Sequence, residues 1–241
     1  MFPMKLIVQK FGGTSVADTS SLKIVAERII ERKKEGYEVV VVPSAMGSST
    51  DELIDLANEL SEKPTPREMD MLLSAGERIT MSLLSMHLNS LGHSSFSLTG
   101  SQAGIITTSR HGKAEIEEIS GERVREGIEQ GDIVIVAGFQ GFNRDTKEIT
   151  TLGRGGSDAT AVALAAALGA EKCEIYTDVD GVFTADPRII NSAKLINEIT
   201  YDEMLEMSSS GAGVLMARSV EFGRRYNVPI IVKSTFTNNK G

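Results

Sequence analysis

Short apolar runs alternate with amphipathic runs of helical spacing along this chain, and this alternation limits its fold more than any other feature. The strand-like runs span residues 5–9, 39–43, 95–99, 132–137, 173–177 and 229–233. Continuous apolar strands separated by helices are typical of a parallel sheet that is covered on both faces. We therefore predict an α/β fold, a three-layer α/β/α sandwich with a mostly parallel central sheet.

The helix-like runs lie between these strands. They span residues 20–34, 51–61, 67–91, 157–168, 201–208 and 215–226. Of the remaining segments, 100–112 is predicted as a loop or short irregular strand, 116–130 carries both strand and helix signals, and 140–149 is predicted as a polar hairpin. No repeat, low-complexity tract or flexible linker interrupts the 241 residues, so we expect one domain over residues 1–241.

Composition excludes several classes of protein. The formal net charge of −8 argues against general nucleic-acid or acidic-membrane partners. A single cysteine, Cys173, excludes an internal disulfide framework and fits a reducing cytoplasm, and its place at the start of a strand predicts a small core residue. No signal peptide is expected, and no apolar run reaches the roughly 20 residues of a membrane helix.

The most informative loop is Lys10-Phe-Gly-Gly-Thr-Ser, between the first strand and the first helix. Gly12 and Gly13 would let the backbone adopt positive φ and approach an anion closely. Backbone N–H groups at a helix start point at that anion, and Lys10 adds a compact positive charge. A phosphate site is the favoured interpretation; a strand-end lysine facing solvent is the alternative. The order of residues is not that of the P-loop.

A second loop, Thr151-Leu-Gly-Arg-Gly-Gly-Ser-Asp158, repeats this design. Arg154 stands between glycines, where a carboxylate or phosphate can reach its planar fork, although a turn arginine at the surface is the alternative. Ser157 could cap the following helix and still contact a ligand. Asp158 lies in the first helical turn, where it either complements the helix dipole or acts on a ligand.

Glu77 is the least obvious candidate. It follows Gly76, which interrupts a long helix and suggests that something approaches closely there. Glu77 could bind a ligand ammonium group, or it could be a solvated helix carboxylate. Asp178, Asp180 and Asp186 lack the spacing of a calcium loop, and the three histidines are scattered, so we expect no metal site and no catalytic histidine.

Taken in order, these motifs resemble the aspartate kinases, a branch of the amino acid kinase family. The matching segments are Lys10-Phe-Gly-Gly-Thr-Ser-Val-Ala-Asp18, Pro43-Ser-Ala-Met-Gly47, Gly76-Glu-Arg78, Gly100-Ser-Gln-Ala-Gly104, Thr151-Leu-Gly-Arg-Gly-Gly-Ser-Asp158 and Thr177-Asp-Val-Asp-Gly-Val-Phe-Thr-Ala-Asp-Pro-Arg188. They cover essentially the whole chain, and other kinases of the family would share the glycine loops but not this set.

The resemblance implies a cytoplasmic enzyme that transfers a phosphoryl group from MgATP to the side-chain carboxylate of L-aspartate. The product would be 4-phospho-L-aspartate, the first step toward lysine, threonine and methionine. Residues 1–170 would form the amino-acid side and residues 171–241 the nucleotide side. The implied phosphate contacts are Lys10, Gly12 and Gly13; the implied aspartate contacts are Ser44, Thr50, Glu77, Arg154, Ser157 and Asp158; the implied nucleotide contacts are Thr177, Asp178, Phe183 and Arg188.

The chemistry agrees with these residue types. An aspartate side chain titrates near 3.9, so the nucleophile is already ionised at neutral pH and needs no general base. Lys10 and magnesium carried by the ATP phosphates would offset charge, Arg154 would hold the α-carboxylate and Glu77 the α-ammonium. Asp158 would orient either Lys10 or the substrate amine, and the sequence leaves both open.

One position departs from the resemblance: some aspartate kinases have a lysine near the nucleotide where this chain has Gly213. The alternatives are a kinase of the same fold with another carboxylate or phosphate acceptor, and a non-catalytic nucleotide-binding subunit.

Aspartate kinases commonly continue into paired ACT domains, and we expect none after Lys233. A catalytic domain alone would associate weakly or as a homodimer and would not respond to lysine or threonine.

Overall fold

The computed structural model describes residues 5–241 and places a six-stranded parallel sheet at the centre of the chain. The strand order is β10-β9-β1-β2-β6-β3, and every neighbouring pair is parallel. These strands are β1 (Leu6–Phe11), β2 (Glu38–Pro43), β3 (Ser95–Leu98), β6 (Ile133–Val136), β9 (Lys172–Thr177) and β10 (Ile230–Ser234). The predicted α/β fold is confirmed, and this sheet is parallel throughout.

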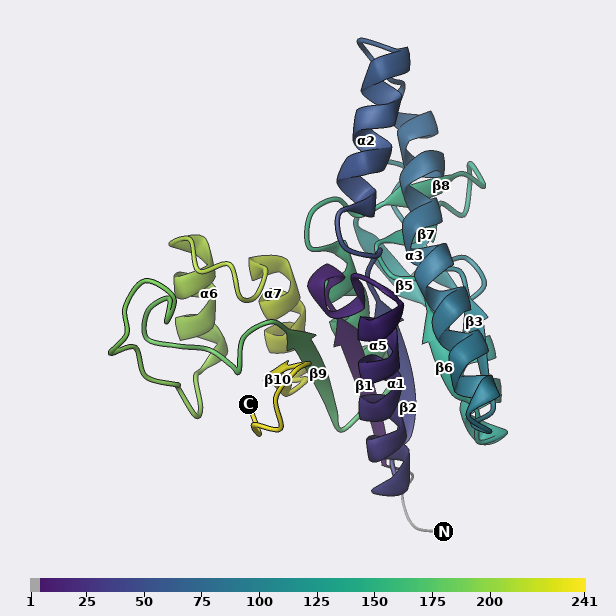
Figure 1. Ribbon diagram of the computed structural model, residues 1–241. Helices are drawn as coiled ribbons and strands as arrows, with labels where there is room; N and C mark the ends of the chain where they lie inside the picture. The colour runs from purple at the N-terminus through teal and green to yellow at the C-terminus, as the bar shows by residue number, and fades with distance from the viewer. Residues whose placement is uncertain (1–4) are drawn as a thin grey trace.

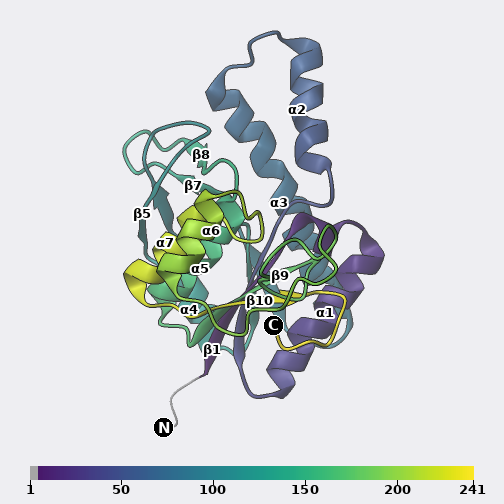
Figure 2. The same cartoon turned by 90° about the vertical axis from the view of Figure 1, so that its left-hand side faces the viewer.

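Helices cover both faces of the sheet (Figures 1 and 2). The helices are α1 (Thr19–Lys34), α2 (Ser49–Leu60), α3 (Pro66–Ser90), α4 (Glu122–Glu129), α5 (Gly156–Leu168), α6 (Tyr201–Ser209) and α7 (Ala217–Tyr226), of which α2 packs against α3. Because side chains alternate along a strand, Val40 and Val42 face one layer while Val39 and Val41 face the other. This alternation explains why the strands are apolar without a break.

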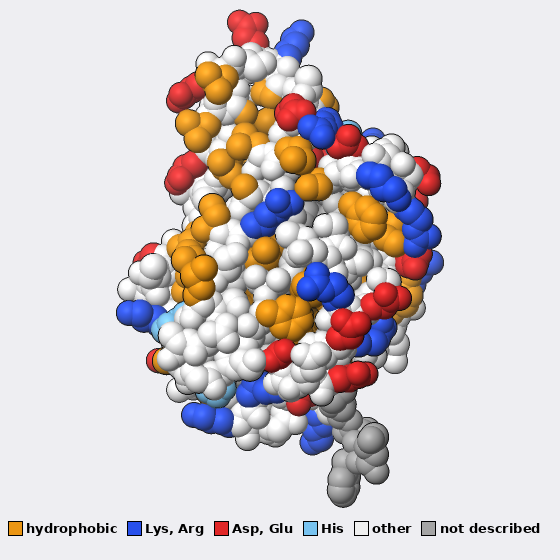
Figure 3. Space-filling view, turned by 90° about the vertical axis from the view of Figure 1, so that its right-hand side faces the viewer, with side chains coloured by type: hydrophobic (Ala, Val, Ile, Leu, Met, Phe, Trp, Pro, Cys, Tyr) orange, Lys and Arg blue, Asp and Glu red, His pale blue; other side chains and the backbone are white. Residues whose placement is uncertain are grey.

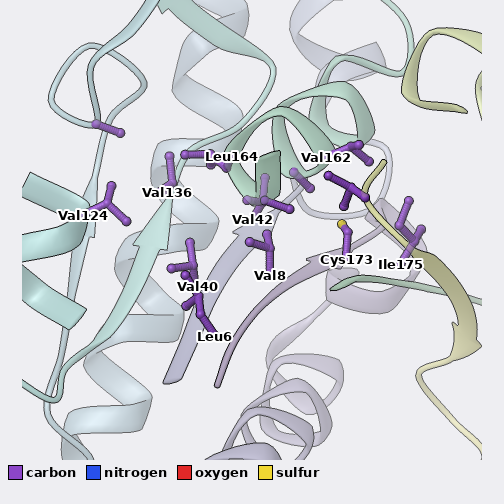
Figure 4. Close-up of a cluster of buried hydrophobic side chains, with 14 of the residues drawn as sticks. Leu6, Val8, Val40, Val42, Val124, Val136, Val162, Leu164, Cys173 and Ile175 are labelled. Carbon is purple, nitrogen blue, oxygen red and sulfur yellow. The ribbon is translucent and has the colours of Figure 1, made fainter. Parts of the chain in front are cut away.

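The two faces carry separate cores. On one face α5 packs its buried, alanine-rich surface against Val8, Val40 and Cys173, and α4, α6 and α7 extend that layer (Figure 4). On the other face α1 and α3 pack against alternate residues of the same strands. Cys173 is fully buried, which confirms its predicted role in the core.

A second, four-stranded sheet lies beside the central one. It consists of β4 (Ile105–Thr107), β5 (Ile116–Ile119), β7 (Gln140–Phe142) and β8 (Ile149–Thr151), in the order β5-β4-β7-β8. It settles the two open segments, because 100–112 contains a strand and 116–130 is a strand followed by α4. The hairpin predicted at 140–149 is confirmed, since β7 and β8 pair antiparallel.

Helices α2 and α3 form a hairpin that projects beyond both sheets (Figures 1 and 2). Apolar side chains gather on its surface (Figure 3), including an α3 stripe of Met71, Ile79, Leu83 and Met86, each between 38% and 66% exposed. No helix within residues 5–241 has the length and apolar character of a membrane span.

The carboxyl ends of the parallel strands meet at one edge of the sheet. Phe11, Pro43, Val136 and Thr177 end their strands there, and each is followed by one of the polar or glycine-rich segments noted in the sequence. Ser44 N–H donates to the carbonyl of Phe11 at 2.9 Å, which joins two of these ends directly. Ligands of open parallel sheets bind at this edge, so the candidate site is sought there.

Candidate active site

An ion pair joins the two glycine loops. Lys10 Nζ, near the end of β1, lies 2.6 Å from Asp158 Oδ1 in the first turn of α5, and both side chains are only 11–12% exposed. The sequence left open whether Asp158 would orient Lys10 or the substrate amine, and the structure places its carboxylate against Lys10. The pair also holds an ammonium group at the start of a helix, where backbone N–H groups already favour an anion.

The positive φ predicted for Gly12 and Gly13 is wrong. Neither has a positive φ, since Gly12 is extended at φ −68° and Gly13 begins a 3-10 turn, Gly13–Val16, that separates the loop from α1. Close approach holds for Gly13, where a Cβ would lie only 3.3 Å from the carbonyl oxygen of Gly47, whereas a Cβ on Gly12 would make an ordinary contact of 3.5 Å with Lys10 Nζ.

In the second loop, the glycines on either side of Arg154 do require positive φ. Gly153 and Gly155 have φ values of 73° and 72°, and a Cβ on Gly155 would meet Met216 at 2.3 Å. Gly155 occupies the N-cap position of α5, so the predicted capping by Ser157 is wrong; Ser157 lies inside the first turn. Arg154 is exposed, and no hydrogen bond or ion pair of its guanidinium is found within residues 5–241.

A cavity of about 270 Å³ brings these groups together. Its lining comprises Lys10, Gly13, Ser44, Ala45, Gly47, Thr50, Glu77, Phe139, Gly153, Arg154, Gly155, Gly156, Ser157 and Asp158. Every residue predicted on the amino-acid side is in this set. The cavity therefore holds two cations and two carboxylates from segments that are far apart in the chain.

Glu77 is buried, so the alternative of a solvated helix carboxylate is wrong. The residue is 4% exposed; Oε1 accepts a hydrogen bond from Ala45 N–H at 3.3 Å, and Oε2 is buried without a partner in the described chain. Burial raises its pKa to about 7, against which two backbone hydrogen bonds and the charge of Lys10 act only in part. The group that approaches Gly76 closely is Ala45 of the same chain, because a Cβ on Gly76 would lie only 2.8 Å from the Cβ of Ala45.

Phe139 lines the same cavity and was not predicted. Its φ of 66° is rare for a bulky residue, and such conformations concentrate at functional sites. Thr160 Oγ1 accepts a hydrogen bond from Phe139 N–H at 3.1 Å, and the Phe139 carbonyl accepts one from Leu152 N–H at 2.8 Å. The signal that the sequence offered was Gly138, a glycine directly after a buried strand. In the structure a Cβ on Gly138 would meet Val42 at 2.7 Å, so this position requires glycine.

A second cavity, of about 520 Å³, lies beyond the end of β9. Thr177, Asp178, Phe183 and Arg188, the four residues predicted on the nucleotide side, all line it. The Arg188 guanidinium forms an ion pair with Asp186 at 3.0 Å. Gly213 also lines the cavity, and a Cβ there would meet nothing within 4 Å, so the position that departs from the resemblance borders open space.

The first glycine loop is tied to the strand that leads into this second cavity. Gly12 N–H donates to the carbonyl of Tyr176 at 3.0 Å, and Phe11 stacks on the Tyr176 ring with centroids 4.7 Å apart. Gly12 itself lines neither cavity. Within residues 5–241 no three His, Cys, Asp or Glu side chains form a cluster that could hold a metal ion.

The model of one family, described as the amino acid kinase family, matches residues 5–234. The chain belongs to this family. It is 58% identical to an aspartokinase of Mycolicibacterium smegmatis and 57% identical to aspartokinase 2 of Bacillus subtilis, in each case over 99% of this chain. It spans only 56% and 58% of the length of these two relatives.

Solved structures agree with this assignment. Aspartate kinase from Synechocystis matches 98% of this family member with a TM-score of 0.86 and 50% identity, and the match covers 39% of that chain. E. coli aspartokinase III in complex with aspartate and ADP matches 96% of it with a TM-score of 0.87 and 29% identity, covering 62% of that chain. A UMP kinase from Ureaplasma parvum, at 19% identity and a TM-score of 0.68, shares the fold alone.

The raised pKa of Glu77 predicts a pH-dependent stability. Between pH 4.5, the ordinary pKa of this group, and about 7, the folded state holds a proton that the unfolded state has lost, so stability falls as pH rises. Glu77→Gln should therefore gain up to about 3 kcal/mol of unfolding free energy relative to the unmodified chain at pH 8, and little at pH 4. Urea unfolding at both pH values measures this. Glu59→Gln, exposed on α2, is the control, and an equal effect of Glu77→Gln at both pH values would contradict the assignment.

Proposed function

We propose that this chain transfers a phosphoryl group from ATP to the side-chain carboxylate of L-aspartate and so forms 4-phospho-L-aspartate. The observation that carries the proposal is the Lys10–Asp158 ion pair at the edge of a cavity that also holds Arg154 and a buried, half-paired Glu77. In this set, Lys10 offers a cation for the transferred phosphoryl group, the Arg154 guanidinium can bind a substrate carboxylate, and Glu77 can bind a substrate ammonium group. The names of the relatives support the same acceptor.

On the amino-acid side, Arg154 would pair with the α-carboxylate through two parallel hydrogen bonds. Glu77 would receive the α-ammonium at its unpartnered Oε2, and a bound cation would favour the ionised carboxylate. Ser44, Thr50 and Ser157 supply hydroxyl groups around the same cavity. Together these contacts would leave the side-chain carboxylate of aspartate directed toward Lys10.

On the nucleotide side, we propose that ATP occupies the larger cavity, which is lined only by residues from Thr177 onward. This division supports the two lobes expected from the sequence, residues 1–170 and 171–241. Phe183 would contact the base, and Gly12 and Gly13 would approach the phosphates. Magnesium would arrive on the ATP phosphates and offset their charge.

The reaction requires positioning and charge compensation. The acceptor carboxylate is ionised at neutral pH, so no residue has to remove a proton. Its oxygen would form a bond to the terminal phosphorus while the bond to the bridging oxygen of ADP breaks. Lys10, held in place by Asp158, would stabilise the charge on the transferred group.

ATP-dependent hydroxamate formation tests the proposal directly. In the presence of hydroxylamine, an acyl phosphate of L-aspartate gives aspartyl hydroxamate, which iron(III) reveals by colour. Parallel reactions with L-glutamate, N-acetyl-L-glutamate and UMP, followed by ADP release, test other acceptors. Turnover with another acceptor but not with L-aspartate would replace the proposed substrate, and no turnover with any would favour a binding function.

Lys10→Met should remove most turnover and leave aspartate binding largely intact, because the charge is needed mainly in the transition state. The expected loss in kcat is roughly a hundred- to a thousandfold, or about 3–4 kcal/mol. Lys5→Met, on an exposed residue just before β1, is the matched control. A kcat equal to that of the unmodified chain would refute the role of Lys10.

Arg154→Lys should lower kcat/KM for aspartate by about tenfold or more, although the charge is kept, because an ammonium group cannot reproduce the planar fork. Steady-state kinetics with aspartate varied at saturating ATP measure the effect. Arg123→Lys, exposed on α4, serves as control. If kcat/KM is unchanged, Arg154 is a turn residue only.

We also propose weak self-association through the α3 stripe. From Ile79 to Ser90 the helix carries no Asp, Glu, Lys or Arg, so two copies related by a two-fold axis could pack there without opposing like charges. Sedimentation velocity over a concentration series should show a dimer that Leu83→Glu abolishes and that Ile189→Glu, at an exposed residue outside the stripe, preserves. Dimerisation unaffected by Leu83→Glu would place the interface elsewhere.

A further inference from the structure

A buried carboxylate outside both cavities joins three segments of the chain. Asp70, on α3, is 1% exposed. Its Oδ1 accepts hydrogen bonds from Thr151 Oγ1 at 2.5 Å and from Gly112 N–H at 3.1 Å, and its Oδ2 lies 2.6 Å from His111 Nδ1. Nothing in the chemistry proposed above uses these residues.

The segments that Asp70 joins are those that carry Arg154. Thr151 ends β8, three positions before the arginine, and its carbonyl accepts a hydrogen bond from Ala114 N–H at 3.0 Å. The Gly112 carbonyl is packed so closely against Gly153 that a Cβ there would lie 2.8 Å from it. The turn that contains His111 and Gly112 therefore packs against the backbone of the second glycine loop and supports it.

The same helix carries Glu77. Glu77 follows Asp70 by two helical turns, so both carboxylates lie on one face of α3. Glu77 lines the smaller cavity, and Asp70 accepts a hydrogen bond from Thr151, in the segment that carries Arg154. The two groups assigned to the ammonium and the α-carboxylate of the substrate are thus set at a fixed separation by bonds to a single helix.

We propose that Asp70, His111 and Thr151 form a positioning network that sets the distance between Arg154 and Glu77, and thereby the fit of an α-amino acid in the cavity. This inference rests on the proposed function for the identity of the amino acid. The network touches neither the acceptor nor the nucleotide, so its loss should weaken aspartate binding while the chemical step and ATP binding remain. Such a selective effect distinguishes positioning from general support of the fold.

The test compares disruptive and conservative variants at two partners of Asp70. Thr151→Val removes the hydroxyl donor and Thr151→Ser keeps it; His111→Phe removes the ring donor and His111→Gln keeps an N–H. The disruptive variants should raise KM for aspartate about tenfold, the loss expected for one hydrogen bond to a charged group, while kcat and KM for ATP stay within about twofold. The conservative variants should stay near the unmodified chain. His93→Phe, at a partly buried residue outside the network, is the control.

Amide hydrogen exchange provides a readout that does not depend on activity. In the chain without substrate, Thr151→Val and His111→Phe should speed exchange across residues 152–156 and leave the strands of the central sheet unchanged. If the unmodified chain does not use aspartate but this local effect appears, the proposed function fails and the network stands. Unchanged exchange, an equal rise of both KM values, or equal effects of conservative and disruptive variants would overturn the network.

Discussion

The ion pair between Lys10 and Asp158 is the interaction on which the arrangement of the site depends. It joins the end of the central strand β1 to the start of the central helix α5, and it lies at the edge where the parallel strands end. A buried charge without a partner is unfavourable, so each residue needs the other when no ligand is present. The pair therefore keeps an ammonium group in place beside the N-terminus of α5.

The helical layers on the two faces of the sheet fix the positions of β1 and α5, and therefore of the two residues of this pair. Strands with both faces apolar require a helical layer on each side, and α5 fills the centre of one layer with small residues that allow close contact with the sheet. The site has the opposite character. It collects cations, carboxylates and glycines at the strand ends, where loops can differ without disturbing the core.

Several parts of the site followed from local sequence. The loops around Gly12 and around Arg154 were predicted to bind anions because glycine, hydroxyl and cationic residues stand next to one another in the chain. The residues expected on the amino-acid side do line one cavity, and those expected on the nucleotide side line another. Their roles toward ligands remain proposals. Local sequence misled where one type of residue serves two purposes: neither Gly12 nor Gly13 has the positive φ expected, and Gly155 takes the capping position expected for Ser157.

The sequence by itself determined the alternation of strand and helix, the parallel sheet and the positions of the two glycine loops, because these depend on short-range periodicity and on the backbone freedom of glycine. Only the tertiary structure decided that Asp158 holds Lys10, that Glu77 is buried with a raised pKa, that Phe139 adopts a positive φ, and that Asp70 joins His111 and Thr151. Each of these depends on groups brought together from distant parts of the chain. Burial and the choice of a hydrogen-bond partner are properties of the packed molecule, and no local pattern of residues encodes them.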